Sequence, residues 1–84
     1  MKPISLSHHA KEQLTRRGTS ESEVTDAIRT AKWSPAELGR LECRKDLPYK
    51  KTWNEKFYNT KQVRPIFFEE NESIIVVTIY VYYF

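Results

Sequence analysis

The sequence is poor in the residues that mark several classes of protein. Cys43 is the only cysteine, so a disulfide within the chain and a zinc site of clustered cysteines are excluded, and a lone thiol is typical of a reducing compartment. Two glycines occur among 84 residues, without a glycine-rich phosphate loop or an HExxH or GxSxG motif. We therefore expect a cytoplasmic protein with no cofactor and no metal.

Long apolar runs are missing as well. The longest, residues 74–84, includes Thr78 and is far shorter than the roughly 20 residues that cross a bilayer as a helix. The sequence turns polar soon after Ile4 and Leu6, so it lacks the hydrophobic region of a signal peptide. Hydrophobic residues make up 39% and charged residues 30%, which is typical of a folded domain. Residues 1–84 therefore form one domain with one core and no membrane span.

Two helices are predicted near the N-terminus. Residues 8–17 contain no glycine or proline and are followed by Gly18, a typical residue after a helix end. Ser20 and Glu23 form a capping box that starts a second helix, and Pro35 prevents its continuation. The apolar residues of this second helix recur at the spacing of one helix face: Val24, Ala27, Ile28 and Ala31.

The remaining sequence predicts strands. Residues 4–6 and 38–44 alternate between apolar and polar side chains, whereas residues 45–60 are rich in lysine and asparagine and predict a long loop or hairpin. Residues 63–69 and 73–83 are β-branched and aromatic and flank a short polar turn, which indicates an antiparallel hairpin. The predicted class is α+β: two N-terminal helices packed on one face of a three- to four-stranded antiparallel sheet, with the other face open.

Charge is concentrated in the middle of the chain. The net charge is +3, but residues 40–64 carry eight basic and three acidic residues, and residues 65–84 carry no basic residue. Such a segment attracts phosphates; the alternative is a solvated surface that keeps the protein soluble. Trp53, Phe57 and Tyr58 lie among the lysines, a mixture typical of proteins that stack single-stranded nucleic acid. The candidate nucleic-acid-binding residues are Arg16, Arg40, Arg44, Lys50, Lys51, Lys61 and Arg64.

Histidines and arginines at the first helix suggest phosphoryl-transfer chemistry. His8 and His9 open the helix, and histidine exchanges protons near neutrality. Helical spacing puts His9 on the same side as Arg16 and Arg17, where a guanidinium would stabilise charge on a phosphate. The alternative is that these are ordinary surface residues, and the sequence does not decide whether His8 or His9 faces a site.

Hydroxyl groups on the last strand form a second group of candidates. Thr78 and Tyr80 are two positions apart and therefore point to the same face. A tyrosine of ordinary pKa acts as a hydrogen-bond donor or as a stacking surface for a base; the alternative is that both residues simply pack in the sheet. Cys43 lies in a predicted strand rather than at a helix N-terminus, so it is a poor candidate for a thiolate nucleophile.

A short ordered pattern connects the predicted helices with the last strand. Its residues are Ser7, His9, Ala10, Arg17, Gly18, Val24 and the strand 77–80. In this pattern the chain resembles an uncharacterised family of small domains with an HA...RG signature, within the barnase/EndoU/colicin/RelE-like (BECR) superfamily of RNA-cutting toxins. The resemblance covers residues 4–31 and the last strand, and residues 44–62 lie outside it.

The resemblance implies a RelE/ParE-like fold with a metal-independent ribonuclease site on the sheet and the first helix. It implies that His9 is the acid or base, that Arg17 clamps phosphate, and that Thr78 or Tyr80 positions the substrate. Gln13 stands where such families usually have a basic residue, and Thr19 where they have isoleucine. The first departure thins the basic site, and the second is a packing change.

The leading hypothesis is a toxin of a toxin-antitoxin system, an endoribonuclease that cuts mRNA or tRNA and is neutralised by a cognate antitoxin protein. One alternative keeps the fold without catalysis, as a nucleic-acid-binding or protein-binding module. Another is a ParE-like inhibitor that binds a DNA topoisomerase and cleaves nothing. A homodimer is compatible with each hypothesis.

Overall fold

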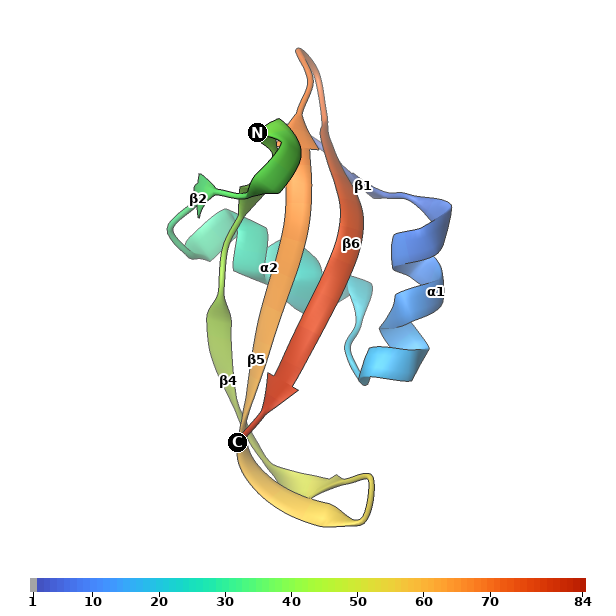
Figure 1. The fold of residues 1–84 in the computed structure, drawn as a ribbon, viewed down its shortest axis with the longest axis vertical. Helices are drawn as coiled ribbons and strands as arrows, with labels where there is room; N and C mark the ends of the chain where they lie inside the picture. Colours follow the sequence, from blue (N-terminus) through green and yellow to red (C-terminus); the bar gives the residue numbers. More distant parts are fainter. Residues whose placement is uncertain (1) are drawn as a thin grey trace.

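The computed structural model describes residues 2–84, which form a layer of two helices against a twisted sheet (Figure 1). The class is α+β, as predicted. The helices of this region are α1 (His8–Arg17) and α2 (Glu21–Thr30), with a short 3-10 helix η1 (Glu37–Gly39). Its strands are β1 (Ile4–Leu6), β2 (Ser34–Pro35), β3 (Leu41–Glu42), β4 (Lys45–Trp53), β5 (Lys56–Glu69) and β6 (Ile74–Tyr83).

Both predicted helices are confirmed, and their ends follow from local side chains. The Ser7 hydroxyl accepts from the Ala10 amide at 3.1 Å, and the Ser20 hydroxyl accepts from the Glu23 amide at 3.1 Å. Gly18 ends α1 in the left-handed conformation with φ +75°. None of the helices described in residues 2–84 is long and apolar enough to cross a membrane.

The predicted sheet is wrong in strand number and in direction. The described sheet has six strands in the order β1-β6-β5-β3-β2, with β4 pairing β5 beside β3. It is mixed, because β1 runs parallel to β6 and Ile4 lies opposite Ile74. Between β1 and β6 the chain forms both helices and the strands β2 to β5. A connection of this length allows β1 and β6 to pair in parallel. The strands β2 and β3 have two residues each, too few to produce a recognisable alternation.

One further segment differs from its prediction, and another agrees with it. Residues 38–44, predicted as a strand, contain part of η1 and only the short β3. Residues 45–60, predicted as a loop or hairpin, form a hairpin of β4 and β5 whose turn residues Asn54 and Glu55 have φ +49° and +69°. This hairpin projects past the end of β6 (Figure 1), and from Lys45 to Tyr49 half-buried residues of β4 alternate with exposed ones.

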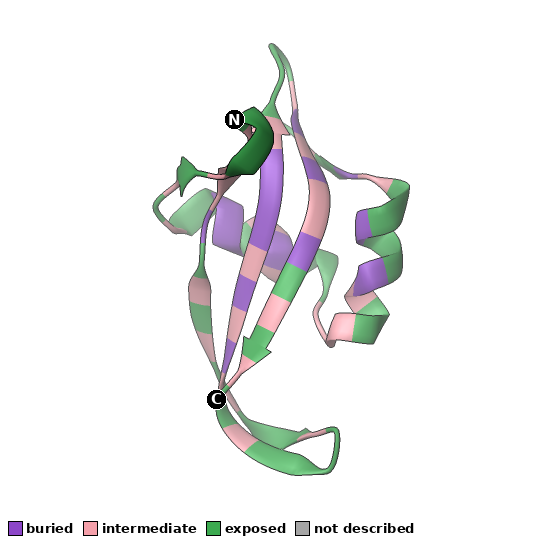
Figure 2. Ribbon diagram, viewed as in Figure 1, coloured by how far each residue is buried: buried purple, intermediate pink, exposed green. Residues whose placement is uncertain are grey.

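The core lies between the sheet and the helices. Val63 and Phe67 of β5 and Val76 and Ile79 of β6 are fully buried there, and Figure 2 shows the buried residues of both helices on the sides facing the sheet. A register shift between Ile66 and Phe67 interrupts the pairing of β5 with β6. The opposite face is the open sheet face, formed by Gln62, Arg64 and Ile66 of β5 and Thr78, Tyr80 and Tyr82 of β6.

A candidate nucleic-acid interface on the open sheet face

Tyr80 lies at the centre of a cluster of charged and aromatic residues. The guanidinium carbon of Arg17 is 5.6 Å from the centroid of the Tyr80 ring, and that of Arg64 is 5.2 Å from it. Arg64 lies directly opposite Tyr80 in the pairing of β5 with β6, and Arg17 is the last residue of α1. We call Arg17, Arg64 and Tyr80 the Tyr80 cluster. It brings two predicted catalytic residues together with one predicted nucleic-acid-binding residue.

Arg64 is held in place by its neighbours. Its Nε donates to Glu42 Oε2 at 3.0 Å, its Nη2 also contacts that oxygen, and its Nη1 donates to the Tyr82 hydroxyl at 3.2 Å. The hydrogen bonds to Glu42 raise the pKa of Arg64 above its usual value, although burial opposes the shift. The Arg64 guanidinium is therefore a positive group held in one position beside Tyr80, rather than a mobile surface cation.

Arg44 extends this arrangement along the open sheet face. Its guanidinium carbon is 5.9 Å from the Tyr82 ring centroid, and its Nη1 donates to Gln62 Oε1 at 3.3 Å. Its Nε lies 3.9 Å from Glu42 Oε1, so the Glu42 carboxylate faces both Arg44 and Arg64. Two arginines thus share one carboxylate, and the face keeps a positive balance.

The backbone that carries Arg17 is anchored to the sheet. The Tyr83 hydroxyl donates to the Arg17 carbonyl at 2.6 Å, and Lys61 Nζ donates to the Gly18 carbonyl at 2.9 Å. Lys61 also pairs with Glu23 Oε1 at 2.8 Å, and its residue is only 7% exposed. Lys61, a predicted nucleic-acid-binding residue, therefore fixes the junction between α1 and α2 from inside the molecule.

Gly18 is required at this junction for two reasons. Its φ of +75° is unfavourable for other residues, and a Cβ at this position would lie 2.3 Å from the Tyr83 hydroxyl and 2.7 Å from Trp53 Cζ3. The Trp53 ring stacks on Tyr83 with centroids 5.1 Å apart. Burial raises the pKa of Tyr83 to about 12, with smaller contributions from Tyr49 and Glu23, so the hydroxyl stays protonated and donates.

Gln13 is a buried residue of α1 that accepts hydrogen bonds from β6. Its Oε1 accepts from the Thr78 hydroxyl at 3.0 Å and from the Ile79 amide at 2.7 Å. A lysine or arginine has no acceptor and would leave that amide unpaired. The glutamine that departs from the expected basic residue thus has a structural reason. Thr78 shares a face with Tyr80 as predicted, but its hydroxyl donates its hydrogen bond to Gln13.

A hollow of about 270 Å³ adjoins the Tyr80 cluster under the turn of η1. We call it the η1 hollow; it is lined by Ala36, Glu37, Leu38, Arg40, Arg64, Ile66, Thr78 and Tyr80. The Arg40 side chain makes no hydrogen bond or ion pair with any residue in the range 2–84. Sequence reasoning missed Glu37 and Leu38, because the alternation of residues 38–44 was interpreted as a strand, although Gly39 is a signal for a turn there.

The histidines lie apart from this cluster. The His8 side chain is 90% exposed, with its Nε2 3.6 Å from Glu12 Oε2. His9 is exposed on α1, and no hydrogen bond, ion pair or ring contact joins it to another described residue. The structure therefore brings Arg17, Thr78 and Tyr80 together and does not join His9 to them.

The remaining candidates are distributed over three places. Arg16 is exposed on α1 beside Arg17, whereas Lys50 and Lys51 are exposed on β4 in the projecting hairpin. Cys43 is buried below the open sheet face, and burial together with Glu42 raises its pKa to about 11. Its thiol stays protonated near neutrality, in agreement with its exclusion as a nucleophile.

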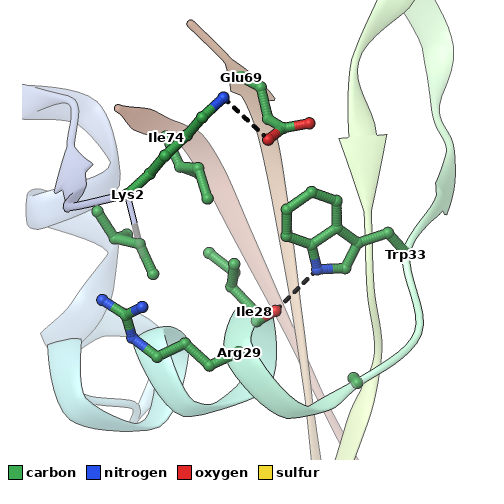
Figure 3. Close-up of a pocket in the computed structure, with 8 residues that line it drawn as sticks. Lys2, Ile28, Arg29, Trp33, Glu69 and Ile74 are labelled. Carbon is green, nitrogen blue, oxygen red and sulfur yellow. Dashed lines mark hydrogen bonds and ion pairs between the residues drawn. The ribbon is translucent and has the colours of Figure 1, made fainter. Parts of the chain in front are cut away.

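A larger hollow of about 420 Å³ lies on the helix side of the sheet, between β1 and the end of α2 (Figure 3). Ile28, Trp33 and Ile74 form apolar walls, and the Trp33 Nε1 donates to the Ile28 carbonyl at 2.7 Å. At its rim, Lys2 Nζ pairs with Glu69 at 3.2 Å. Its lining is mostly apolar, and its two cations, Lys2 and Arg29, each have an interaction of their own, so it does not resemble a phosphate site and we do not include it.

Comparison of the chain with protein-family models, with curated proteins and with solved structures finds no significant match in any of the three.

Proposed function

We propose that this protein binds single-stranded RNA on its open sheet face and cleaves it without a metal, as the toxin of a toxin-antitoxin pair. The observation that carries the proposal is the Tyr80 cluster, in which α1, β5 and β6 contribute two guanidinium groups around one exposed tyrosine. Arginine and aromatic groups on an uncovered face suit phosphates and unstacked bases. The resemblance to RelE-like domains, with helices on one face only, supports the same proposal.

The proposed cleavage reaction is a transesterification. The 2′-hydroxyl oxygen of the RNA attacks the adjacent phosphorus, the bond from phosphorus to the 5′-oxygen breaks, and the products are a cyclic phosphate and a 5′-hydroxyl. Arg17 and Arg40 stabilise the charge on the phosphate oxygens, and the Tyr80 hydroxyl donates a hydrogen bond. The proton of the 2′-hydroxyl goes to His9 in the mechanism implied by the resemblance, or to Glu37, the carboxylate in the lining of the η1 hollow. The leaving 5′-oxygen takes up a proton from solvent water, which gives the 5′-hydroxyl.

The biological setting of the proposal is the cytoplasm, where mRNA or tRNA is the substrate and an acidic antitoxin covers the basic face. Binding without cleavage is the second candidate function. It is favoured by one observation, the absence of any contact between His9 and the Tyr80 cluster among the described residues.

The test is cleavage of a mixed RNA substrate in EDTA by wild type, His9→Ala, Glu37→Gln, Arg17→Ala and, as a control for loss of one positive charge, Lys32→Ala. Lys32 is exposed next to the end of α2. We expect cyclic phosphate ends from wild type and Lys32→Ala, and a loss of at least about tenfold in Arg17→Ala. Loss of cleavage in His9→Ala or in Glu37→Gln identifies the residue that accepts the proton of the 2′-hydroxyl.

Two outcomes lead elsewhere. If wild type binds RNA in a salt-sensitive way but leaves it intact, the binding function replaces cleavage. If Arg17→Ala and Lys32→Ala cleave equally well, the Tyr80 cluster is not the site, whatever activity the protein has.

A further inference from the structure

Leu38 is an apolar side chain held in solvent by its own backbone. The residue is 84% exposed, and its φ of +60° and ψ of +33° lie in the left-handed region, which a leucine rarely adopts. Gly39 follows with φ +72°. Exposure of the apolar side chain and the left-handed backbone both cost free energy. Within residues 2–84 Leu38 does not belong to the hydrophobic core that would offset this cost, which suggests that its partner is another molecule.

The turn that carries Leu38 is closed by hydrogen bonds and is therefore a defined shape. The Ala36 amide donates to the Arg40 carbonyl at 2.8 Å, and the Arg40 amide donates to the Glu37 carbonyl at 3.2 Å. Leu38 and Arg40 both line the η1 hollow. Leu38 and the Arg40 side chain, which has no side-chain partner in residues 2–84, thus lie together over the open sheet face.

The lining of the η1 hollow combines the contacts that a nucleobase needs. Ile66 is 8% exposed and forms an apolar floor, with Leu38 and Tyr80 also in the lining. Glu37 is the lining carboxylate, and carboxylates accept hydrogen bonds from base amino groups. The volume of about 270 Å³ is enough space for one base.

We propose that the η1 hollow binds one unpaired nucleobase of a single-stranded RNA. Leu38 packs on the base, and Arg40 contacts the adjacent phosphate. Glu37 accepts from the base amino group where His9, and not Glu37, takes the 2′-hydroxyl proton. Arg40 and Arg64 line the hollow, and Arg17 lies against the ring of Tyr80, which also lines it; these cations are complementary to a phosphate chain. A duplex is excluded, because its bases are stacked and paired and do not reach such a hollow. This inference rests on the proposed RNA binding.

The probes are three fluorescein-labelled 2′-O-methyl RNA octamers, which bind but lack the attacking hydroxyl: single-stranded oligocytidine, the same backbone without bases, and the duplex of the oligocytidine with its complement. Binding is measured by fluorescence anisotropy with wild type, Leu38→Ala and Phe84→Ala. Phe84 is the matched control, because it is an exposed apolar residue at 57% that does not line the η1 hollow.

We expect wild type and Phe84→Ala to bind the single strand at least about tenfold more tightly than the abasic strand or the duplex. Leu38→Ala should lose most of that preference and keep its affinity for the abasic strand. Equal affinity for the single and abasic strands, or a Leu38→Ala variant identical to wild type, overturns the base site while leaving RNA binding in place. If wild type binds none of the probes at low salt, both the base site and the proposed function are wrong.

Discussion

Replacement of Gly18 by alanine should severely destabilise the protein. The added Cβ would lie 2.3 Å from the Tyr83 hydroxyl and 2.7 Å and 2.8 Å from two ring carbons of Trp53. The left-handed φ costs about 1 kcal/mol for a residue with a Cβ, overpacking costs about 1–3 kcal/mol, and displacement of Tyr83 from the Arg17 carbonyl costs about 1 kcal/mol more. The expected loss is about 3–5 kcal/mol, close to the whole stability of a small domain.

The measurement is urea unfolding followed by circular dichroism, with Gly39→Ala as the control. Gly39 has a similar φ of +72°, but no atom lies within 4 Å of its would-be Cβ. Gly39→Ala should therefore lose only the conformational term of about 1 kcal/mol. If the two variants lose the same stability, contact of Gly18 with Trp53 and Tyr83 is not what makes glycine necessary there, and the anchoring of Arg17 described above is wrong.

Three further predictions concern the same framework. Leu38→Gly should raise the urea midpoint, by up to about 1 kcal/mol in unfolding free energy, because glycine accepts the left-handed backbone. Lys61→Met should lower the free energy of unfolding by about 1–3 kcal/mol, because the hydrogen bond to Gly18 and the ion pair with Glu23 are lost. It should leave the salt dependence of RNA binding unchanged, because a buried lysine neutralises no phosphate. A shallower salt slope in the variant would contradict this. The pKa of Tyr83 is raised from 10 to about 12 in the folded protein, so its contribution to stability is complete below pH 10 and is lost as the pH rises to 12. Unfolding titrations of Tyr83→Phe should lack that part of the alkaline decline.

The helices could be predicted because their signals are local. Ser7, Gly18 and Ser20 act on residues within one turn, and the apolar spacing of α2 is independent of the rest of the chain. The sheet depends on distant pairings: the three residues of β1 pair with the start of β6 at the other end of the sequence, and no local pattern specifies a partner or a direction. In β4 the half-buried positions 45, 47 and 49 include a lysine, so the apolar alternation that marks a half-buried strand is weak there.

The candidate site was predictable to the extent that it depends on strand alternation. Thr78 and Tyr80 share the open sheet face for that reason. The pairing of Arg64 with Glu42 depends on the register of β3 against β5, which the sequence does not specify. Lys61 contradicts the general rule that lysines are exposed, and only the position of the Gly18 carbonyl and Glu23 explains its burial.

The most direct test of the central claim is an NMR titration of the ¹⁵N-labelled protein with the single-stranded 2′-O-methyl oligocytidine. The account predicts the largest amide shifts on the open sheet face and its rim, at Arg17, Arg40, Arg64 and Tyr80, and small shifts at Ile28 and Trp33 on the helix side. Shifts concentrated at Ile28 and Trp33, or in the hairpin at Lys50 and Lys51, would contradict it and place RNA binding elsewhere on the molecule.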